Sequence, residues 1–137
     1  MIRLDLEPPY HYGFIESRIT INGLSFDHRL LVDTGAYGLV LATSRAALYG
    51  HRLLARAPLI PGAGAAGAMG FHTLRADELE LLTSQWRSAG PTTVYFPDPP
   101  ADYRSIGCDG LIGTADLQRL GAQLRLNYAT GAGGIRL

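Results

Sequence analysis

The chain of 137 residues contains no lysine and one cysteine, and all 12 of its basic residues are arginine. A lone cysteine, Cys108, excludes an internal disulfide framework and a cysteine-rich zinc site. The 12 basic residues balance 12 acidic ones, and no basic run occurs anywhere in the sequence. The chain therefore lacks the charge pattern of a nucleic-acid-binding protein, and no nucleic-acid partner is expected.

Long apolar runs are also missing. No window approaches the roughly 18–20 apolar residues that a membrane-spanning helix needs, so no integral membrane segment is expected. The first residues show no basic region followed by an apolar stretch, so no signal peptide is expected either. The chain as it stands is expected in the cytoplasm, and a leader or anchor removed from it would instead indicate the periplasm.

The residues that are present predict one folded domain over residues 1–137. Hydrophobic residues make up 47% of the chain and charged residues 18%, which is enough to form a core. Turn residues interrupt the sequence at short intervals, and most segments between them are too short for ordinary helices. The pattern predicts an all-β domain with one or two short helices.

Several segments have specific signatures. Residues 15–21 alternate apolar and polar side chains and lead into Asn22-Gly23, a strong hairpin signal. A short helix is predicted to begin after Thr43 or Ser44, either of which is its N-cap, and to end at Leu48. A second is predicted over residues 115–120, with Thr114 as its N-cap. Further strands are predicted over residues 26–32, 39–41, 71–82 (with a helix as the alternative for 78–81), 92–96, 110–113, 124–128 and 134–137. Residues 58–70 and 97–104 are predicted as loops.

The segment with the clearest chemistry is Leu30-Leu31-Val32-Asp33-Thr34-Gly35-Ala36. An acidic side chain here follows three apolar residues and precedes a tight turn, in which Gly35 accepts backbone angles that other residues resist. An ordinary β-turn aspartate is the alternative interpretation. The apolar runs on both sides place the turn inside the core, where a carboxylate needs hydrogen bonds or a partner group.

The order of motifs resembles the single-domain, retropepsin-like aspartic proteases, including their bacterial members. The likeness spans most of the chain: a hairpin leading into Asp33-Thr34-Gly35-Ala36, a glycine-rich segment, then Gly110-Leu111-Ile112-Gly113 before a short helix, and a closing strand pair around Thr130-Gly131. Such a protein is an aspartic endopeptidase with a retropepsin-like β-barrel protomer and no metal or other cofactor.

The resemblance implies a homodimer, because the family uses two catalytic aspartates and this chain has one Asp-Thr-Gly. Asp33 from each subunit would form the catalytic dyad and activate a water against a protein or peptide substrate. Thr34 would hydrogen-bond across the two-fold axis, and Gly35 would let its backbone approach the opposing carboxylate. Residues 62–70 would form a mobile flap over the substrate. The implied substrate-binding residues are Ala36, Tyr37, Gly67, Ala68 and Met69.

Two features depart from the family pattern. Tyr37 stands where a small or acidic polar residue is usual, and the flap segment is rich in alanine. They leave open a second hypothesis, a catalytically silent dimerisation or peptide-binding module with the same fold.

Other candidate sites have weaker support. Residues 62–67 match G-x-G-x-x-G, which makes a nucleotide-dependent enzyme the third hypothesis. It is the weakest of the three, because the strand and helix that a dinucleotide site needs are not predicted there. The four histidines lack metal-ligand spacing and are predicted at the surface or in turns. Cys108 has no evident histidine partner, so no thiol nucleophile is expected. Asp109 is predicted to cap the turn with Gly110, and a catalytic role is the alternative. Trp86 is predicted to be half-buried, and the alternative is a hairpin-tip anchor for a partner or a membrane surface.

Overall fold

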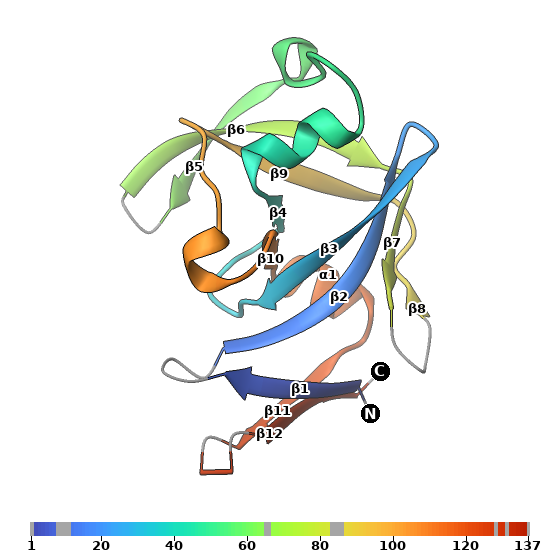
Figure 1. The fold of residues 1–137 in the computed structure, drawn as a ribbon, viewed down its shortest axis with the longest axis vertical. Coiled ribbons are helices and arrows are strands. Elements are labelled where there is room, and N and C mark those ends of the chain that lie inside the picture. The colour runs from blue at the N-terminus through green and yellow to red at the C-terminus, as the bar shows by residue number, and fades with distance from the viewer. Residues whose placement is uncertain are drawn as a thin grey trace.

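The computed structural model describes residues 2–7, 12–64, 67–82, 87–127, 129–130 and 132–136, and its architecture is all-β, as predicted (Figure 1). The strands are β1 (Ile2–Glu7), β2 (Tyr12–Ile21), β3 (Leu24–Val32), β4 (Leu39–Leu41), β5 (Leu59–Gly64), β6 (Gly67–Ala76), β7 (Glu78–Leu81), β8 (Arg87–Ser88), β9 (Thr92–Asp98), β10 (Gly110–Ile112), β11 (Gln123–Asn127) and β12 (Ala132–Arg136). Short helices are η1 (Thr43–Leu48), η2 (Leu54–Arg56), η3 (Arg104–Ile106) and α1 (Thr114–Arg119). Within the described ranges, no helix has the length and apolar character to cross a membrane.

The strands form one sheet in the order β11-β12-β1-β2-β3-β10-β4-β9-β6-β5, and β7 pairs with β2 and β8. The β5–β6 hairpin lies at one end of the molecule and β1, β11 and β12 lie at the other (Figure 1). The two terminal strands are antiparallel neighbours, with Ile2 opposite Ile135. The predicted closing strand pair is present, although Tyr128, Gly131 and Leu137 lie outside the described residues.

The β2–β3 hairpin confirms the Asn-Gly signal. Ile21 pairs with Leu24, and the two residues between them have positive φ angles, 51° at Asn22 and 79° at Gly23. Two positive φ angles in a two-residue loop match the right-handed twist of the flanking strands. Alternate side chains of β2 then enter the core, with Ile19 fully buried.

The centre of the sheet brings two distant segments together. β10 inserts between β3, to which it is parallel, and β4, to which it is antiparallel. Gly110 permits this crossing, since a Cβ there would lie 2.0 Å from the Val40 carbonyl oxygen. The register Ile112↔Val32 places the ends of β3 and β10 side by side.

The prediction of a loop over residues 58–70 is wrong, because this segment contains β5 and the start of β6. Gly62 pairs with Met69 across the hairpin, and β6 continues along β9 from Gly70 to Ala76. Backbone hydrogen bonds do not need β-branched side chains, and pairing with β9 supplies a template for β6. The Phe71 ring packs over Gly62, where an added Cβ would meet it at 2.6 Å.

The predicted helix caps are also wrong. The N-cap of η1 is Ala42 and that of α1 is Gly113, and neither makes a side-chain cap bond. The Thr43 hydroxyl is used instead in a tertiary contact, donating to the Pro97 carbonyl over 2.7 Å.

Other boundaries shift. The predicted strand 71–82 breaks at Asp77, whose N–H donates to the Thr20 carbonyl over 2.7 Å. Residues 78–81 form β7, a strand and not the alternative helix. The loop predicted over 97–104 is shorter, because β9 extends to Asp98 and η3 begins at Arg104.

His28 contradicts the prediction that the histidines lie at the surface, since it is 1% exposed within the core. Tyr49 donates its hydroxyl to the Ile19 carbonyl over 2.8 Å, so His28 Nε2 donates to that hydroxyl over 2.6 Å. Arg45 Nε donates to His28 Nδ1 over 3.2 Å. Burial, and then the Arg45 charge, lower the pKa of His28 to about 4.

The other histidines differ from one another. His51 is exposed, and His72 is half-buried with Nε2 3.4 Å from an oxygen of Asp98. His11 lies outside the described residues, as does Trp86. In the described part of the chain, no three His, Cys, Asp or Glu side chains gather as a metal site.

Candidate active site

Asp33 follows the last residue of β3 and begins a loop over residues 33–38 that leads to β4. Its N–H donates to the Ile112 carbonyl of β10 over 3.0 Å, and its own carbonyl accepts from the Ala36 N–H over 3.2 Å. The side chain is half-buried, and its Oδ1 accepts the Gly35 N–H over 2.8 Å. The loop thus fixes both the backbone and the carboxylate of Asp33.

Gly35 does not use the unusual backbone angles that its place in the turn predicts. Its φ angle is not in the positive range that favours glycine. A Cβ at this position would lie 3.2 Å from Asp33 Oδ1, which is closer than ordinary van der Waals contact. The absence of a side chain therefore leaves room for the carboxylate beside the amide that binds it.

The loop is tied to the segment after β10. Thr114 donates its N–H to the Ala36 carbonyl over 2.9 Å, and Ala115 donates to the Tyr37 carbonyl over 2.8 Å. Gly113 allows this approach, since a Cβ there would lie 2.6 Å from the Ala36 oxygen. The two motifs that stand out in the sequence, around Asp33 and around Gly113, are therefore joined in one structural unit.

Asp33 lies in a large cleft of about 990 Å³ between the loop and the β5–β6 hairpin. Asp33 is the only ionisable carboxylate or base among the lining residues, and most of the others are apolar or glycine. The lining consists of Asp33, Gly35, Ala36, Tyr37, Gly38, Val40, Ile60, Pro61, Gly62, Ala63, Met69, Phe71, Tyr95, Ala101, Tyr103 and Leu111. A mostly apolar surface with a few placed polar groups is typical of a ligand-binding site.

Two aromatic rings connect the hairpin to the loop. Phe71 of β6 meets Tyr95 of β9 edge-to-face, with 6.1 Å between the ring centroids. Tyr95 in turn packs over Gly38, where a Cβ would lie 2.6 Å from the ring. The two contacts link β6 to the loop that carries Asp33.

The predicted site residues divide into two groups. Asp33, Gly35, Ala36, Tyr37 and Met69 line the cleft, with Tyr37 74% exposed. Thr34, Gly67 and Ala68 do not line it, and all three are exposed.

Sequence reasoning missed one wall of the cleft, which is formed by Tyr95, Ala101 and Tyr103. The segment around Ala101 and Tyr103 has no periodicity, so nothing in the sequence indicates which way it folds. The sequence predicted the strand over residues 92–96 that carries Tyr95, but it did not indicate the contact of this ring with Gly38.

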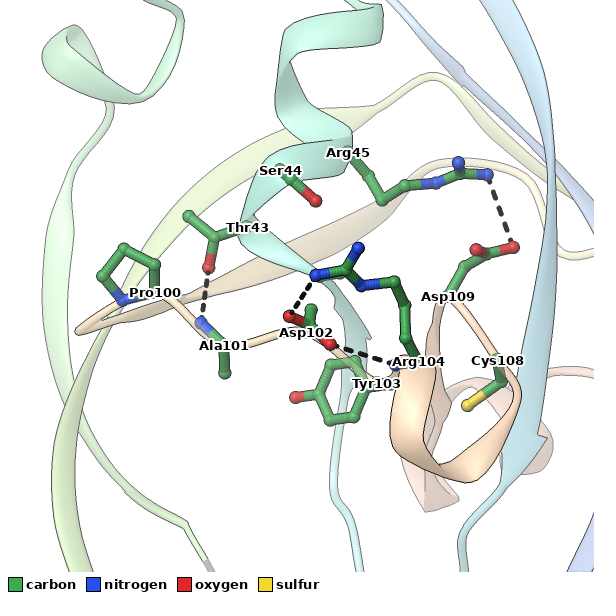
Figure 2. Close-up of a pocket in the computed structure, with 11 residues that line it drawn as sticks. Thr43, Ser44, Arg45, Pro100, Ala101, Asp102, Tyr103, Arg104, Cys108 and Asp109 are labelled. Carbon is green, nitrogen blue, oxygen red and sulfur yellow. Dashed lines mark hydrogen bonds and ion pairs between the residues drawn. The ribbon is translucent and has the colours of Figure 1, made fainter.

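The prediction for Asp109 is wrong. Its Oδ2 accepts the N–H of Arg29 over 2.8 Å. The same oxygen lies 3.3 Å from a guanidinium nitrogen of Arg45 (Figure 2). The carboxylate therefore joins β3 to η1 and does not cap a turn with Gly110. Cys108 beside it is buried, which raises the pKa of its thiol and disfavours the reactive thiolate.

The glycine-rich segment over residues 62–67 lies at the end of the β5–β6 hairpin. The strands Leu59–Gly64 and Gly67–Ala76 flank it, and no helix begins within its described residues. Dinucleotide phosphates bind at the N-terminus of a helix after such a motif, so this segment lacks the required geometry.

The sequence profile described as aspartyl protease matches residues 17–116, well over half of the chain. The chain belongs to the aspartyl protease family. The matched region contains both the Asp33 loop and Gly113, which packs against that loop. Family membership supports a protease, that is, a hydrolase.

The crystal structure of a retropepsin-like aspartic protease from Rickettsia conorii has the same fold. It superposes with a TM-score of 0.63 at 14% sequence identity, and the match covers 98% of this chain and 86% of the Rickettsia chain. This aspartyl protease therefore has a retropepsin-like fold. Among curated protein sequences, none matches the chain.

Proposed function

We propose that this chain is an aspartic endopeptidase that acts as a homodimer, with one Asp33 from each subunit in the active site. The observation that carries the proposal is the position of Asp33, held by the Gly35 amide in a cleft of about 990 Å³. The sequence contains one Asp-Thr-Gly, so a second catalytic aspartate would come from a second copy. Thr34 and Gly35 are exposed in the single chain, which leaves them accessible to that copy.

In this dimer the two Asp33 carboxyl groups would share one proton, because two adjacent carboxylates repel each other strongly. The ionised group removes a proton from water as the water oxygen attacks the peptide carbonyl carbon. The protonated group donates its proton to the carbonyl oxygen. When the C–N bond breaks, a proton passes to the leaving nitrogen, and the products are a carboxylic acid and an amine.

The other predicted residues take supporting roles in the proposal. Thr34 hydrogen-bonds across the two-fold axis, and Gly35 orients the carboxylate. Ala36, Tyr37 and Met69 contact the substrate from within the cleft. The β5–β6 hairpin, including Gly67 and Ala68, closes over the substrate as a flap and excludes water.

The test is a digest of a peptide library by the wild-type chain and by Asp33→Asn from acid to neutral pH, read by mass spectrometry. Asp109→Asn is the matched control, because Asp109 is a carboxylate outside the cleft. We expect cleavage by the wild type and by Asp109→Asn, and none by Asp33→Asn.

Two results would contradict the proposal. Equal cleavage by wild type and Asp33→Asn would place the activity elsewhere. No cleavage by the wild type, with an intact dimer, would favour the silent peptide-binding module.

A further inference from the structure

One wall of the cleft comes from the segment between β9 and β10, and this segment is anchored to η1. Thr43 donates its N–H to the Ala101 carbonyl over 3.0 Å, and its hydroxyl oxygen accepts the Ala101 N–H over 3.2 Å. The same hydroxyl donates to the Pro97 carbonyl. Ala101 is therefore fixed from two sides (Figure 2).

The residues that follow are held by local hydrogen bonds. Asp102 Oδ1 accepts the Arg104 N–H over 3.1 Å. The Tyr103 carbonyl accepts N–H groups from Ile106 and Cys108, each over 3.2 Å. The backbone of Tyr103 is thus preorganised. Tyr103 lines both the cleft and a smaller cavity of about 330 Å³, which Figure 2 shows.

The Tyr103 side chain lines the same cleft as Asp33 and is half-buried. Burial raises the pKa of its hydroxyl, with smaller contributions from Cys108 and the negative charge of Asp33. The phenol therefore stays protonated across acid and neutral pH, and its O–H remains a donor. No hydrogen-bond partner for this hydroxyl exists among the described residues.

The remaining donors in the cleft wall are few. Among the described residues that line the cleft, three side chains carry an O–H or N–H donor apart from the carboxyl group of Asp33, and all three are tyrosines. Tyr37 is 74% exposed at the rim, and the Tyr95 ring is packed over Gly38. An extended peptide presents one backbone carbonyl per residue, whatever its sequence, and leaving such a group unpaired in an apolar cleft is costly.

We propose that the Tyr103 hydroxyl donates a hydrogen bond to a backbone carbonyl of the bound peptide, beside the Asp33 carboxylate. Tyr103 is then a substrate-binding residue that holds the peptide against the dyad independently of side-chain sequence. This inference rests on the proposed function of the same cleft.

The test compares Tyr103→Phe with the wild-type chain on one cleaved peptide. Loss of one hydrogen bond of about 0.5–1.5 kcal/mol predicts a decrease in kcat/KM of about 2- to 12-fold, with an unchanged thermal midpoint. Ser44→Ala is the control, because it removes an exposed hydroxyl that lies outside the cleft. We expect that control to retain its kcat/KM.

A second measurement separates a substrate contact from a structural role. Peptides in which one backbone carbonyl near the cleaved bond is replaced by a methylene are assayed with both enzymes in a double-mutant cycle. When the replaced carbonyl is the one that Tyr103 contacts, Tyr103→Phe and the wild type should have equal kcat/KM on that peptide. The inference would be overturned if Tyr103→Phe had the same kcat/KM as the wild type on the unmodified peptide. It would also be overturned if Tyr103→Phe had a lower kcat/KM than the wild type on every one of the modified peptides.

Failure of the proposed function would look different. If Asp33→Asn cleaves the same peptide at the wild-type rate, the peptidase proposal fails and the Tyr103 proposal fails with it. If Asp33→Asn is inactive while Tyr103→Phe is indistinguishable from wild type, only the role of Tyr103 is wrong.

Discussion

The Gly35 amide donates a 2.8 Å hydrogen bond to Oδ1 of Asp33, two residues earlier in the chain. The turn that follows β3 thereby orients the carboxylate that β3 delivers to the cleft. This bond uses one oxygen of Asp33. Preorganised donors of this kind avoid the cost of reorienting a carboxylate during a reaction.

Gly35→Ala tests this relationship. The added Cβ would lie 3.2 Å from Asp33 Oδ1, so the carboxylate must move by a few tenths of an ångström. We expect kcat to fall about tenfold or more, because small displacements of a catalytic group are costly, while the melting temperature changes little. Steady-state kinetics and a thermal melt measure both. An unchanged kcat would show that the position of this carboxylate does not limit the reaction.

Gly113→Ala should act on stability first. Its Cβ would lie 2.6 Å from the Ala36 oxygen and 2.6 Å from the Tyr37 carbonyl carbon, both in backbone that cannot rotate away. Overpacking of this kind costs about 1–3 kcal/mol in the free energy of unfolding. Gly70→Ala is the control, since its nearest neighbour at 3.0 Å is a methyl of Leu59. Urea denaturation should show the larger loss for Gly113→Ala, and equal losses would contradict the account.

Much of this fold was predictable because its signals are local. The Asn22-Gly23 turn and the apolar runs before Asp33 and Gly113 depend on neighbouring residues, and each appears where the sequence indicates. The β5 strand was not predictable, because its glycine and alanine residues have low strand propensity. It forms by pairing with β6, which β9 holds in place along seven residues from Gly70 to Ala76.

Part of the candidate site could likewise be predicted from local sequence, and part could not. The sequence predicted Asp33, Ala36 and Tyr37 because they follow one another in a recognisable motif. Tyr103 was missed because its place depends on the Thr43–Ala101 hydrogen bonds, which join residues 58 positions apart. His28 was misjudged because its burial depends on Tyr49, a partner with no visible relation to it in the sequence.

His28 makes stability depend on pH. Its pKa is lowered to about 4 in the folded chain, from 6.5 in the unfolded chain. Between these values the unfolded state binds a proton that the folded state does not, so stability decreases as pH falls from about 6.5 to about 4. The loss attributable to His28 approaches about 3 kcal/mol.

The variant His28→Gln isolates this contribution. It removes the titrating group, so its free energy of unfolding should change less than that of the wild type between pH 7 and pH 4. Urea denaturation at several pH values measures the difference. Parallel curves for the two proteins would mean that His28 does not titrate in this range.

Thr92 should stabilise the domain through Asp116. The Thr92 hydroxyl donates over 2.6 Å to Oδ1 of Asp116, whose side chain is almost fully buried in α1. Thr92→Val keeps the shape but removes the donor, and we expect a loss of about 1–3 kcal/mol in the free energy of unfolding. Thr92→Ser retains the hydroxyl and should lose less. A smaller loss for valine than for serine would show that the methyl group matters more than the hydrogen bond.

The central claim is that one active site needs Asp33 from two chains. Wild-type and Asp33→Asn chains are unfolded together, mixed in known ratios and refolded, and the cleavage rate is measured at constant total protein. If each site requires two Asp33 residues, activity falls as the square of the wild-type fraction, to about a quarter in an equal mixture. Activity that falls in proportion, to about half, would mean that each chain works with its own Asp33 alone and would contradict the shared dyad.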